Sequence, residues 1–521
     1  MVIDVSKLDS FVQAPDHQAE LEAPPIHHAQ PPPPQSAPEP VPWTLRGFAR
    51  EHPWWTTAVV LVLLSTVLVA WAGTRPSYDA YGWLVWGHQT LHLTLDLGGA
   101  PSWKPLPYLF TLPYAVAGGH ALRLWMITVT AFSLAAAIFA GRIAFRLTLA
   151  RTARLYAAIV AAVFAGGAVL GLEDYMHYIL SAQTDPMIVT FCLAAIDAFL
   201  LRHYRLAFAL GVVASLGRPE VWPFLGLYSV WAWLRIPSMR WLLLAGLAVV
   251  AFMWFGVPWI TNNRPLVSEQ LALGSPRELR QNQVTGTIGR FTELEYLPVW
   301  LAALVAVAVA VVRRDRIVLS LAAICLCWVV VEIAFALHGW PALSRYMFEA
   351  AGVTAVLAGV GAGWIMAEAP RVWRGVPRWT GVAVVVVLAG TLVPGALGRL
   401  RDERVDLHHE RGRTHEIALL QYAIEALGGY RHIRNCGEPV TNVEYVSTLA
   451  WFTKLDVGFV GHRPAYELAQ KYPIVLFTPL PKGGWIVAPV HTHAAQIRRC
   501  SGLNAAYVRT RGRPHGIIVR R

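Results

Sequence analysis

The chain has 521 residues, of which 55% are hydrophobic and 15% are charged, and its mean hydropathy is +0.44. These values exclude an ordinary soluble enzyme and are typical of a polytopic membrane protein. The formal net charge of +12 does not indicate nucleic-acid binding, because the basic residues are scattered through short gaps between apolar segments.

Residues 1–50 form a polar leader that contains HHAQPPPPQSAPEPVP and few large apolar side chains. A segment of this composition cannot bury enough surface to offset its ordering entropy, so we expect a disordered, Pro-rich cytoplasmic tail. About fifty polar residues precede the first apolar segment, unlike a cleavable signal peptide, so that segment is expected to remain as a membrane anchor.

Apolar segments of membrane-spanning character follow the leader. A helix needs roughly 20 residues to cross a hydrocarbon core about 30 Å thick. We expect eleven spans, of which the fifth and sixth are short, near residues 54–73, 121–141, 152–171, 183–201, 204–217, 220–235, 240–259, 298–312, 317–337, 346–366 and 379–396.

The arginine residues predict the orientation of these spans. With the amino terminus in the cytoplasm, every cytoplasmic gap is basic, as the positive-inside rule requires. The gaps contain Arg142, Arg146, Arg151, Arg154, Arg202, Arg205, Arg235, Arg240, Arg313, Arg314, Arg316, Arg371, Arg374 and Arg378. An odd number of spans then places the carboxyl end outside, in a multi-pass protein of the plasma membrane.

Residues 397–521 differ from the apolar segments before them. Short mixed stretches such as IVLFTPLP and GWIVAPV alternate with helical patterns such as HEIALLQYAIEAL, which predicts a small extracytoplasmic α/β domain. The expected division is therefore a tail at 1–50, a membrane domain at 51–396 and an external domain at 397–521. Cys436 and Cys500 lie outside in this topology, either as a disulfide or as two buried thiols; a disulfide would stabilise the domain by roughly 4 kcal/mol.

The first external loop contains two charged residues of interest. Asp79 stands among aromatic residues at a membrane edge, where an ionisable group is costly unless it is functional or paired in the structure. Lys104 is the only lysine between Lys7 and Lys454. It is either an interfacial lysine or a point charge for a phosphate group. Four aromatic residues of the loop could stack on sugar rings or on an isoprenoid chain, but interfacial belts use the same residue types and a belt is the first expectation; they are Trp83, Trp86, Trp103 and Tyr108.

Several motifs, taken in order, resemble the GT-C superfamily of glycosyltransferases, which use polyprenyl-phosphate sugars. This superfamily includes protein O-mannosyltransferases and the bacterial lipid A aminoarabinose transferase. The resemblance covers roughly residues 54–366 and rests on YDAYGWLVWG, SWKPLPYLFTLPYAVAGGHALRLWM, SAQTDPMIV, LGRPEVWPFLGLY and LSRYMFEAAG. The chain departs from the mannosyltransferases in having Ala80 after Asp79, where they usually show paired acids.

The resemblance implies a role for each motif residue. Asp79 is expected to be the catalytic base, and Asp185 to assist the base or orient the acceptor, although Thr-Asp-Pro is also a normal helix start. The residues expected to bind the donor phosphate are Lys104, Arg218, Arg345 and Tyr346. The two arginines could instead donate to carbonyl groups at helix ends. Glu173 and Asp174 either bind the acceptor or a divalent cation, or belong to a solvated loop.

The function expected from these features is transfer of a sugar, with inversion, from a polyprenyl-phosphate donor to an extracytoplasmic acceptor. The acceptor would be a cell-envelope glycan, a glycolipid or a protein, and no cofactor is implied beyond a divalent cation. Two alternatives are a flippase or transporter for an envelope precursor and a non-catalytic membrane scaffold. Acidic residues within spans, here Asp197 and Glu332, are typical of transporters.

Overall fold

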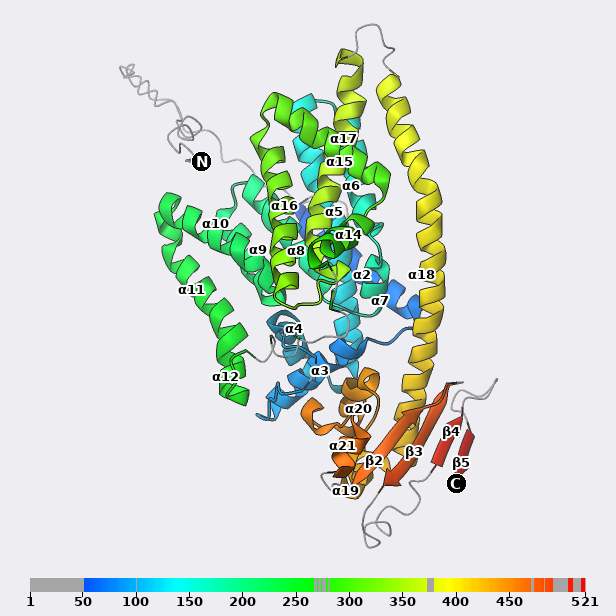
Figure 1. Cartoon of the computed structure of the whole chain (residues 1–521). Coiled ribbons are helices and arrows are strands. Elements are labelled where there is room, and N and C mark those ends of the chain that lie inside the picture. The colour runs from blue at the N-terminus through cyan, green and yellow to red at the C-terminus, as the bar shows by residue number, and fades with distance from the viewer. Residues whose placement is uncertain are drawn as a thin grey trace, which may run out of the picture. The chain divides into compact units, whose positions relative to one another are not determined.

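The structure is a computed structural model, and Figure 1 shows its helices and strands. It describes residues 51–99, 101–266, 269, 273, 278–279, 282–372, 379–469, 473–481 and 483–490, and the backbone of 505–508 and 517–520. The expected disordered tail at 1–50 lies outside these residues. The residues from Thr57 onward belong to one unit, which carries all the features described below.

A helix occupies each segment that was expected to span the membrane. These helices are α2 (Pro53–Ala72), α5 (Ala121–Thr152), α6 (Leu155–Leu170), α8 (Asp185–Leu200), α9 (Tyr204–Gly217), α10 (Trp222–Arg235), α11 (Arg240–Ala251) with its continuation α12 (Val257–Asn262), α15 (Leu297–Arg313), α16 (Arg316–Leu337), α17 (Phe348–Val372) and α18 (Thr380–Ala426). A π-helical turn, Phe252–Gly256, joins α11 to α12.

The number of spans is smaller when length and composition are applied to the described residues. Six helices are long and apolar enough to cross a membrane, or seven if α14 (Gln283–Glu293) and α15, bent by 99°, form one span. The difference from eleven arises because some helices are short: α6 and α8 have 16 residues each. At 1.5 Å per residue such a helix is about 24 Å long, less than the hydrocarbon core. The chain is thus a mainly α, polytopic membrane protein whose exact span count remains a prediction.

Short helices fill the segments between the spans. They are α3 (Tyr78–Leu91), α4 (Pro105–Ala115), α7 (Tyr175–Leu180) and the 3-10 turns Gly118–His120, Pro219–Val221, Pro237–Met239 and Ser344–Met347. The aromatic residues of the first loop do not form an interfacial belt. Trp83, Trp86 and Trp103 are completely buried and Tyr108 nearly so, and the Trp86 and Trp103 rings lie 5.2 Å apart. The belt expectation is wrong because α3 and α4 fold back onto each other and onto the core.

Glycine residues allow α17 to pack closely in the centre of the bundle. A Cβ atom on Gly361 would lie 1.9 Å from the carbonyl oxygen of Ala302 in α15, and one on Gly359 would lie 2.4 Å from that of Ala161 in α6. Small residues bring helix backbones together in this way in membrane proteins. This close packing holds the amino-terminal end of α17, which begins beside the candidate site, in a defined position.

The carboxyl-terminal part combines helices with a five-stranded sheet. After α18 it contains α19 (Gly429–Cys436), α20 (Val446–Thr453), α21 (Pro464–Ala469) and the 3-10 turns Val443–Tyr445 and Val457–Phe459. The sheet has the order β1-β2-β3-β4-β5, in which only β1 and β2 are parallel. Its strands are β1 (Glu438–Val440), β2 (Ile474–Pro479), β3 (Gly484–Val490), β4 (Ala505–Val508) and β5 (Ile517–Arg520). The expected small α/β region is confirmed.

The long helix α18 connects the membrane domain to this region without a break. The expected domain boundary at 396/397 falls inside α18, because Pro394 does not end the helix. Trp485 of β3 donates a hydrogen bond of 2.7 Å to the Glu416 carbonyl of α18, and Tyr81 of α3 packs in the same hydrophobic cluster as the sheet. The segment between α2 and α5 and the carboxyl-terminal region therefore share a core.

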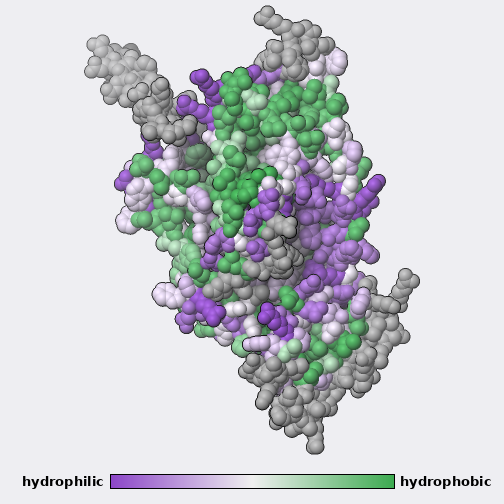
Figure 2. Space-filling view, in the orientation of Figure 1, coloured by the Kyte–Doolittle hydropathy of each residue, from purple (hydrophilic) through white to green (hydrophobic). Residues whose placement is uncertain are grey.

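Hydrophobic and hydrophilic side chains separate on the surface seen in Figure 2. Hydrophobic side chains gather over the upper part of the view, where α15 and α16 lie, and hydrophilic ones gather along the middle of α18. The charged stretch that follows the apolar start of α18, RDERVDLHHERGR, accounts for this change. It brings ionic side chains to the segments between helices that carry the candidate site.

Candidate active site

Three cationic side chains converge on Asp185, the first residue of α8. Lys104 Nζ and Arg345 Nη1 each lie 3.9 Å from its carboxylate, and Arg218 forms a direct ion pair with it. Asp185 is completely buried, and a buried carboxylate requires such partners because an uncompensated charge is costly away from water. The structure thus brings together the predicted residues of four distant motifs.

Helix ends and turns hold these cations in place. Lys104 precedes Pro105 and is the N-cap residue of α4, Arg218 follows α9 with extended backbone, and Arg345 lies in the 3-10 turn before α17. Proline after Lys104 and after Arg218 disfavours helical backbone at both residues. Each cationic side chain is therefore attached at a turn of the chain, where it can point into the space between the helices.

Arg218 has more partners than the sequence predicted. Its Nη1 lies 3.2 Å from Glu220, its Nε lies 3.8 Å from Glu349, and its guanidinium lies 4.0 Å from the centre of the Tyr346 ring. Both glutamates are buried. Glu220 and Glu349 were missed at the sequence level, although an acid two residues after Arg218 in an apolar turn was a usable signal. Arg218 is therefore largely engaged by the protein itself.

Lys104 and Arg345 differ from Arg218, because their donors remain available. Separations of 3.9 Å from a carboxylate exceed hydrogen-bond distance, whereas the two Nη atoms of Arg218 donate hydrogen bonds to Glu220 and Asp185. Burial lowers the pKa of Lys104, and the charge of Asp185 raises it only in part. The two side chains thus present positive charge that protein acceptors do not satisfy.

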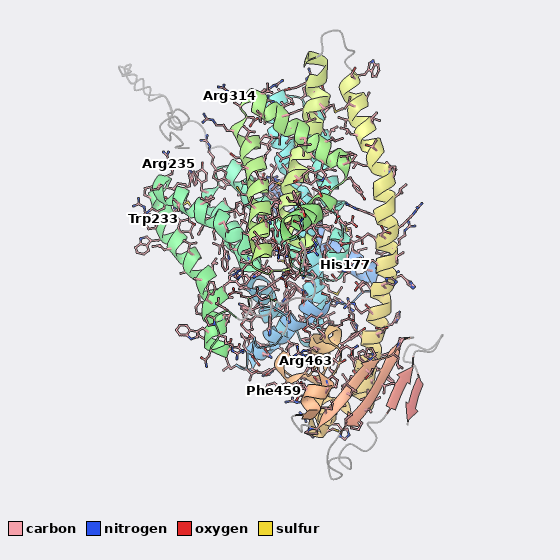
Figure 3. All side chains as sticks on the ribbon, in the orientation of Figure 1. His177, Trp233, Arg235, Arg314, Phe459 and Arg463 are labelled. Atoms are coloured by element: carbon pink, nitrogen blue, oxygen red, sulfur yellow. The ribbon has the colours of Figure 1, made fainter. Side chains whose placement is uncertain are left out.

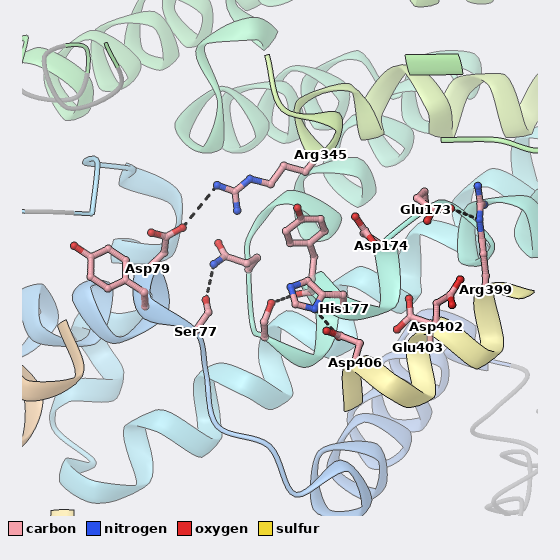
Figure 4. Close-up of a pocket in the computed structure, with 14 residues that line it drawn as sticks. Ser77, Asp79, Glu173, Asp174, His177, Arg345, Arg399, Asp402, Glu403 and Asp406 are labelled. Atoms are coloured by element: carbon pink, nitrogen blue, oxygen red, sulfur yellow. Dashed lines mark hydrogen bonds and ion pairs between the residues drawn. The ribbon is translucent and has the colours of Figure 1, made fainter. Parts of the chain in front are cut away.

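Asp79 lies between this cation cluster and a polar cavity of about 550 Å³. Its carboxylate is 3.9 Å from Arg345 Nη2, and its side chain is 23% exposed, unlike that of Asp185. Figure 4 shows Asp79 and Arg345 at one end of the cavity and α18 at the other. The cavity is lined by Ser77, Tyr78, Asp79, Glu173, Asp174, His177, Tyr178, Ser181, Gln183, Arg345, Arg399, Asp402, Glu403 and Asp406.

Glu173 and Asp174 lie on this cavity but away from the cation cluster. Glu173 pairs with Arg399 of α18, and Asp174 is the N-cap residue of α7 with a left-handed backbone. Within the described part of the chain, no group of three or more His, Cys, Asp or Glu side chains is arranged to hold a metal ion. The geometry does not bring these two acids to Asp79 as a cation site.

The α18 side of the cavity was not expected from the sequence. Asp402, Glu403 and Asp406 point toward α7, where His177 Nδ1 and Asp406 Oδ2 form a hydrogen bond of 2.6 Å. Burial lowers the pKa of His177, but the hydrogen bond and charge of Asp406 raise it above its usual value overall. The only sequence signal was the density of acids after the last apolar segment.

The in-span acid Asp197 has a structural explanation. It lies near the other end of α8 and pairs with Arg146 at 2.7 Å and with Arg142 at 3.2 Å. Arg235 and Arg314 belong, like Arg142 and Arg146, to the basic gaps expected on the cytoplasmic side. Figure 3 shows Arg235 and Arg314 at the end of the bundle away from Phe459 and Arg463. Asp197 therefore neutralises basic residues at a helix end, whereas Glu332 is buried near Arg218.

The fold and this site define a class of polytopic membrane protein with a charged cluster between helix ends and the loops that join them. No protein-family model matches the chain, and no curated protein matches it. Among solved structures, the chain is similar to ArnT from Cupriavidus metallidurans in the apo state, with 14% identity, 84% of this chain and 96% of that chain covered, and a TM-score of 0.51. ArnT from Cupriavidus metallidurans bound to undecaprenyl phosphate is similar with the same identity and coverage and a TM-score of 0.48. The chain thus has an ArnT-like fold, which agrees with the fold class expected from the sequence.

Proposed function

We propose that the chain is an integral membrane glycosyltransferase that moves a sugar from a polyprenyl-phosphate donor to an extracytoplasmic acceptor with inversion. The observation that carries the proposal is the available positive charge of Lys104 and Arg345 beside the partly exposed carboxylate of Asp79. Glycosyl transfer from a lipid phosphate needs these two elements together: cations for the departing phosphate and a base for the acceptor hydroxyl.

Each residue has a distinct task in the proposed reaction. Asp79 takes the proton of the acceptor hydroxyl as its oxygen forms a bond to the anomeric carbon. The bond from that carbon to the phosphate oxygen breaks, and the electron pair leaves with the lipid phosphate. Lys104 and Arg345 stabilise this developing charge, and Arg218, held by buried carboxylates, adds to the positive field.

Asp185 acts as a positioning residue in this scheme. It is completely buried and contacts all three cations, so it offers no face to an acceptor. Its charge keeps three like charges together that would otherwise repel one another. Of the roles expected from the sequence, neither assisting the base nor orienting the acceptor is favoured by these contacts.

A second cavity provides space for a lipid chain next to the cation cluster. It has a volume of about 390 Å³, is almost entirely apolar, and lies between α8, α9, α10, α16 and α17. Cys192, Phe224, Trp328 and Glu349 line it, and Glu349 contacts Arg218. A polyprenyl chain seated there would keep its phosphate at the cations.

Replacing Asp79 by Asn tests the assignment of the base. The change keeps the shape and removes the proton acceptor, so turnover should fall by about 10²–10⁴-fold with little change in donor affinity. The measurement is transfer of radiolabelled sugar from polyprenyl-phosphate donors in a lipid extract. Asp96→Asn, in the same loop and outside the cavity, serves as the control.

Replacing Lys104 by Met tests the donor site separately. The change keeps most of the apolar stem and removes the charge, so donor affinity should weaken together with turnover. Near-normal turnover of Asp79→Asn, or unchanged donor affinity and turnover of folded Lys104→Met, would refute the proposed mechanism.

A further inference from the structure

Two cavities lie on either side of α7 and share one residue, Glu403 of α18. The polar cavity beside Asp79 is lined by His177 and Tyr178 of α7 and by Ser181, which follows this helix. The other, of about 370 Å³, is lined by Met176, Ile179 and Leu180 of the same helix. The two cavities are therefore adjacent, and they differ sharply in chemistry.

The polar cavity has more negative than positive charge. Asp79 faces Arg345, Glu173 pairs with Arg399, and Asp406 pairs with His177. The remaining three carboxylates form no ion pair within the described part of the chain; they are Asp174, Asp402 and Glu403. Carboxylates without cations are acceptors for hydroxyl donors, and the two tyrosines of this cavity, Tyr78 and Tyr178, offer ring surfaces.

A buried amide in the same cavity also lacks a partner. The Gln183 side chain is 5% exposed, its Nε2 donates a hydrogen bond to Ser77, and its Oε1 accepts none among the described residues. A buried unsatisfied oxygen is costly unless a ligand supplies a donor. Gln183 and the acids together form a site for a ligand that carries several hydroxyl groups.

The adjacent apolar cavity is suited to a hydrocarbon chain. Its lining residues come from α2, α5, α7 and α18, and most are apolar, such as Leu68, Leu134 and Leu400. The outer faces of α2 carry exposed large hydrophobic side chains, as expected of a surface in contact with lipid. A chain entering from the bilayer would end at Glu403, where the polar cavity begins.

We infer that the acceptor is a lipid-anchored, uncharged glycan, with its sugar head in the polar cavity and its hydrocarbon chain in the apolar cavity beside α7. The inference rests on the proposed function, because it uses Asp79 as the base that meets the acceptor hydroxyl. It deepens that function by separating the acceptor lipid, between α2, α5, α7 and α18, from the donor lipid, between α8, α10 and α16.

The charge of the polar cavity also selects against acidic acceptors. A phosphate or carboxylate in place of a neutral hydroxyl would meet Asp174 and Asp402, and like charges at close range repel. Arg345, the available cation that also lines this cavity, lies at the Asp79 end of it, away from these acids. An uncharged glycan therefore fits this cavity better than a phosphorylated one.

Photo-crosslinking in native membranes can identify the occupant of the apolar cavity. Leu134 of α5 is replaced by p-benzoylphenylalanine in the full-length protein, which is irradiated in membranes of the organism that encodes it and purified for mass spectrometry of the adduct. Ile138 is the matched control, since it lies one turn further along α5, is also partly buried, and lines a different cavity. Met176 provides a second position in the apolar cavity if the first variant does not fold.

The expected adduct at Leu134 or Met176 is a glycolipid with uncharged sugars, absent at Ile138. Its yield should fall about tenfold when Asp402→Asn and Glu403→Gln are combined, since a hydrogen bond to a charged group contributes a factor of this order. Glu425→Gln, an exposed acid on the same helix outside the cavity, should leave the yield unchanged. Phospholipid adducts of equal yield at Leu134 and Ile138, an acidic glycolipid, or a polypeptide adduct would each overturn the inference.

The inference and the proposed function fail in different ways. Sugar transfer in the same membranes without a glycolipid adduct would support the glycosyltransferase activity and contradict the lipid-anchored acceptor. A glycolipid adduct in a protein that transfers no sugar would support the glycolipid-binding site and contradict the proposed reaction.

Discussion

Lys104 shows how the surroundings of one residue can adapt it to a task. Its side chain is 17% exposed, lies near two arginines, and is balanced only by carboxylates at a distance. A lysine in such surroundings holds its proton less firmly than a lysine in water, because burial and like charges disfavour the charged form. The same features make it attractive to a phosphate, which would supply the missing negative charge.

As the pH rises, donor affinity should therefore begin to decrease at a lower pH than it would if Lys104 had the pKa of an ordinary lysine. The charged form binds the phosphate, and the pKa of Lys104 is lowered from 10.5, so positive charge is lost as pH rises through this lowered value. The measurement is the dissociation constant of a polyprenyl phosphate as a function of pH. Lys104→Arg, which stays charged, should remove the alkaline loss; an unchanged profile in that variant would contradict the assignment.

At the scale of single helices, α17 determines where Arg345 and Glu349 lie. The helix begins directly after the turn that carries Arg345, and its glycine residues contact neighbouring backbones. Close packing of backbones leaves no room for a helix to shift, so the turn at its start is held firmly. The stability of α17 and the geometry of the site are thus linked.

Replacing Gly361 by Val should destabilise the protein by about 1–3 kcal/mol, in the range of overpacked cores. The new Cβ would overlap the Ala302 carbonyl oxygen, which is 1.9 Å from its ideal position and belongs to a helix backbone that cannot move aside. The measurement is thermal unfolding of the purified protein in detergent. Gly390→Val on α18, where no atom lies within 4 Å, should have a much smaller effect. Equal melting temperatures for the two variants would disprove the packing argument.

At the scale of the whole molecule, α18 joins the membrane domain to the carboxyl-terminal region. Its charged middle lines the polar cavity, and its end packs against the sheet. Arg413 of this helix also donates to the carbonyl groups of Arg75 and Pro76, just before Asp79. The carboxyl-terminal region is therefore part of the support of the candidate active site.

The arginine distribution predicts that this carboxyl-terminal region lies outside the cytoplasm. A reporter that is active only in the cytoplasm should be silent when it is fused after Arg521 and active when it is fused within residues 1–50. An active reporter after Arg521 would rule out the proposed topology, because the candidate site would then face the cytoplasm.

A disulfide between Cys436 and Cys500 remains a prediction about the same region. Cys436 is buried at the end of α19, whereas Cys500 lies outside the described residues. Mass spectrometry of non-reduced peptides should find the two cysteines linked, and Cys436→Ser should cost the region roughly 4 kcal/mol. Two freely alkylated thiols would show that the pairing is wrong.

Much of this protein could be predicted from the sequence, because local patterns carry the information. Long apolar segments form helices wherever they occur, so the positions of the helices agreed with expectation. Asp79 stood out as a carboxylate at a membrane edge and Lys104 as the only lysine between Lys7 and Lys454, whereas Arg218 and Arg345 were expected from the family resemblance. The meeting of Lys104, Arg218 and Arg345 at Asp185 agrees with the motif order on which the family resemblance was based.

Only the tertiary structure decided which side chains are buried and which cavities they share. Trp83 and Trp103 could belong to an interfacial belt or to a core, since the same residue types serve both, and the folding back of α3 and α4 decides for the core. Glu349 and Glu403 come from helices far apart in the sequence, and nothing in either local pattern shows that one contacts Arg218 and the other lines two cavities. Helix formation is governed by neighbours along the chain, whereas a site is made by contacts between distant segments, and a single sequence does not record those contacts.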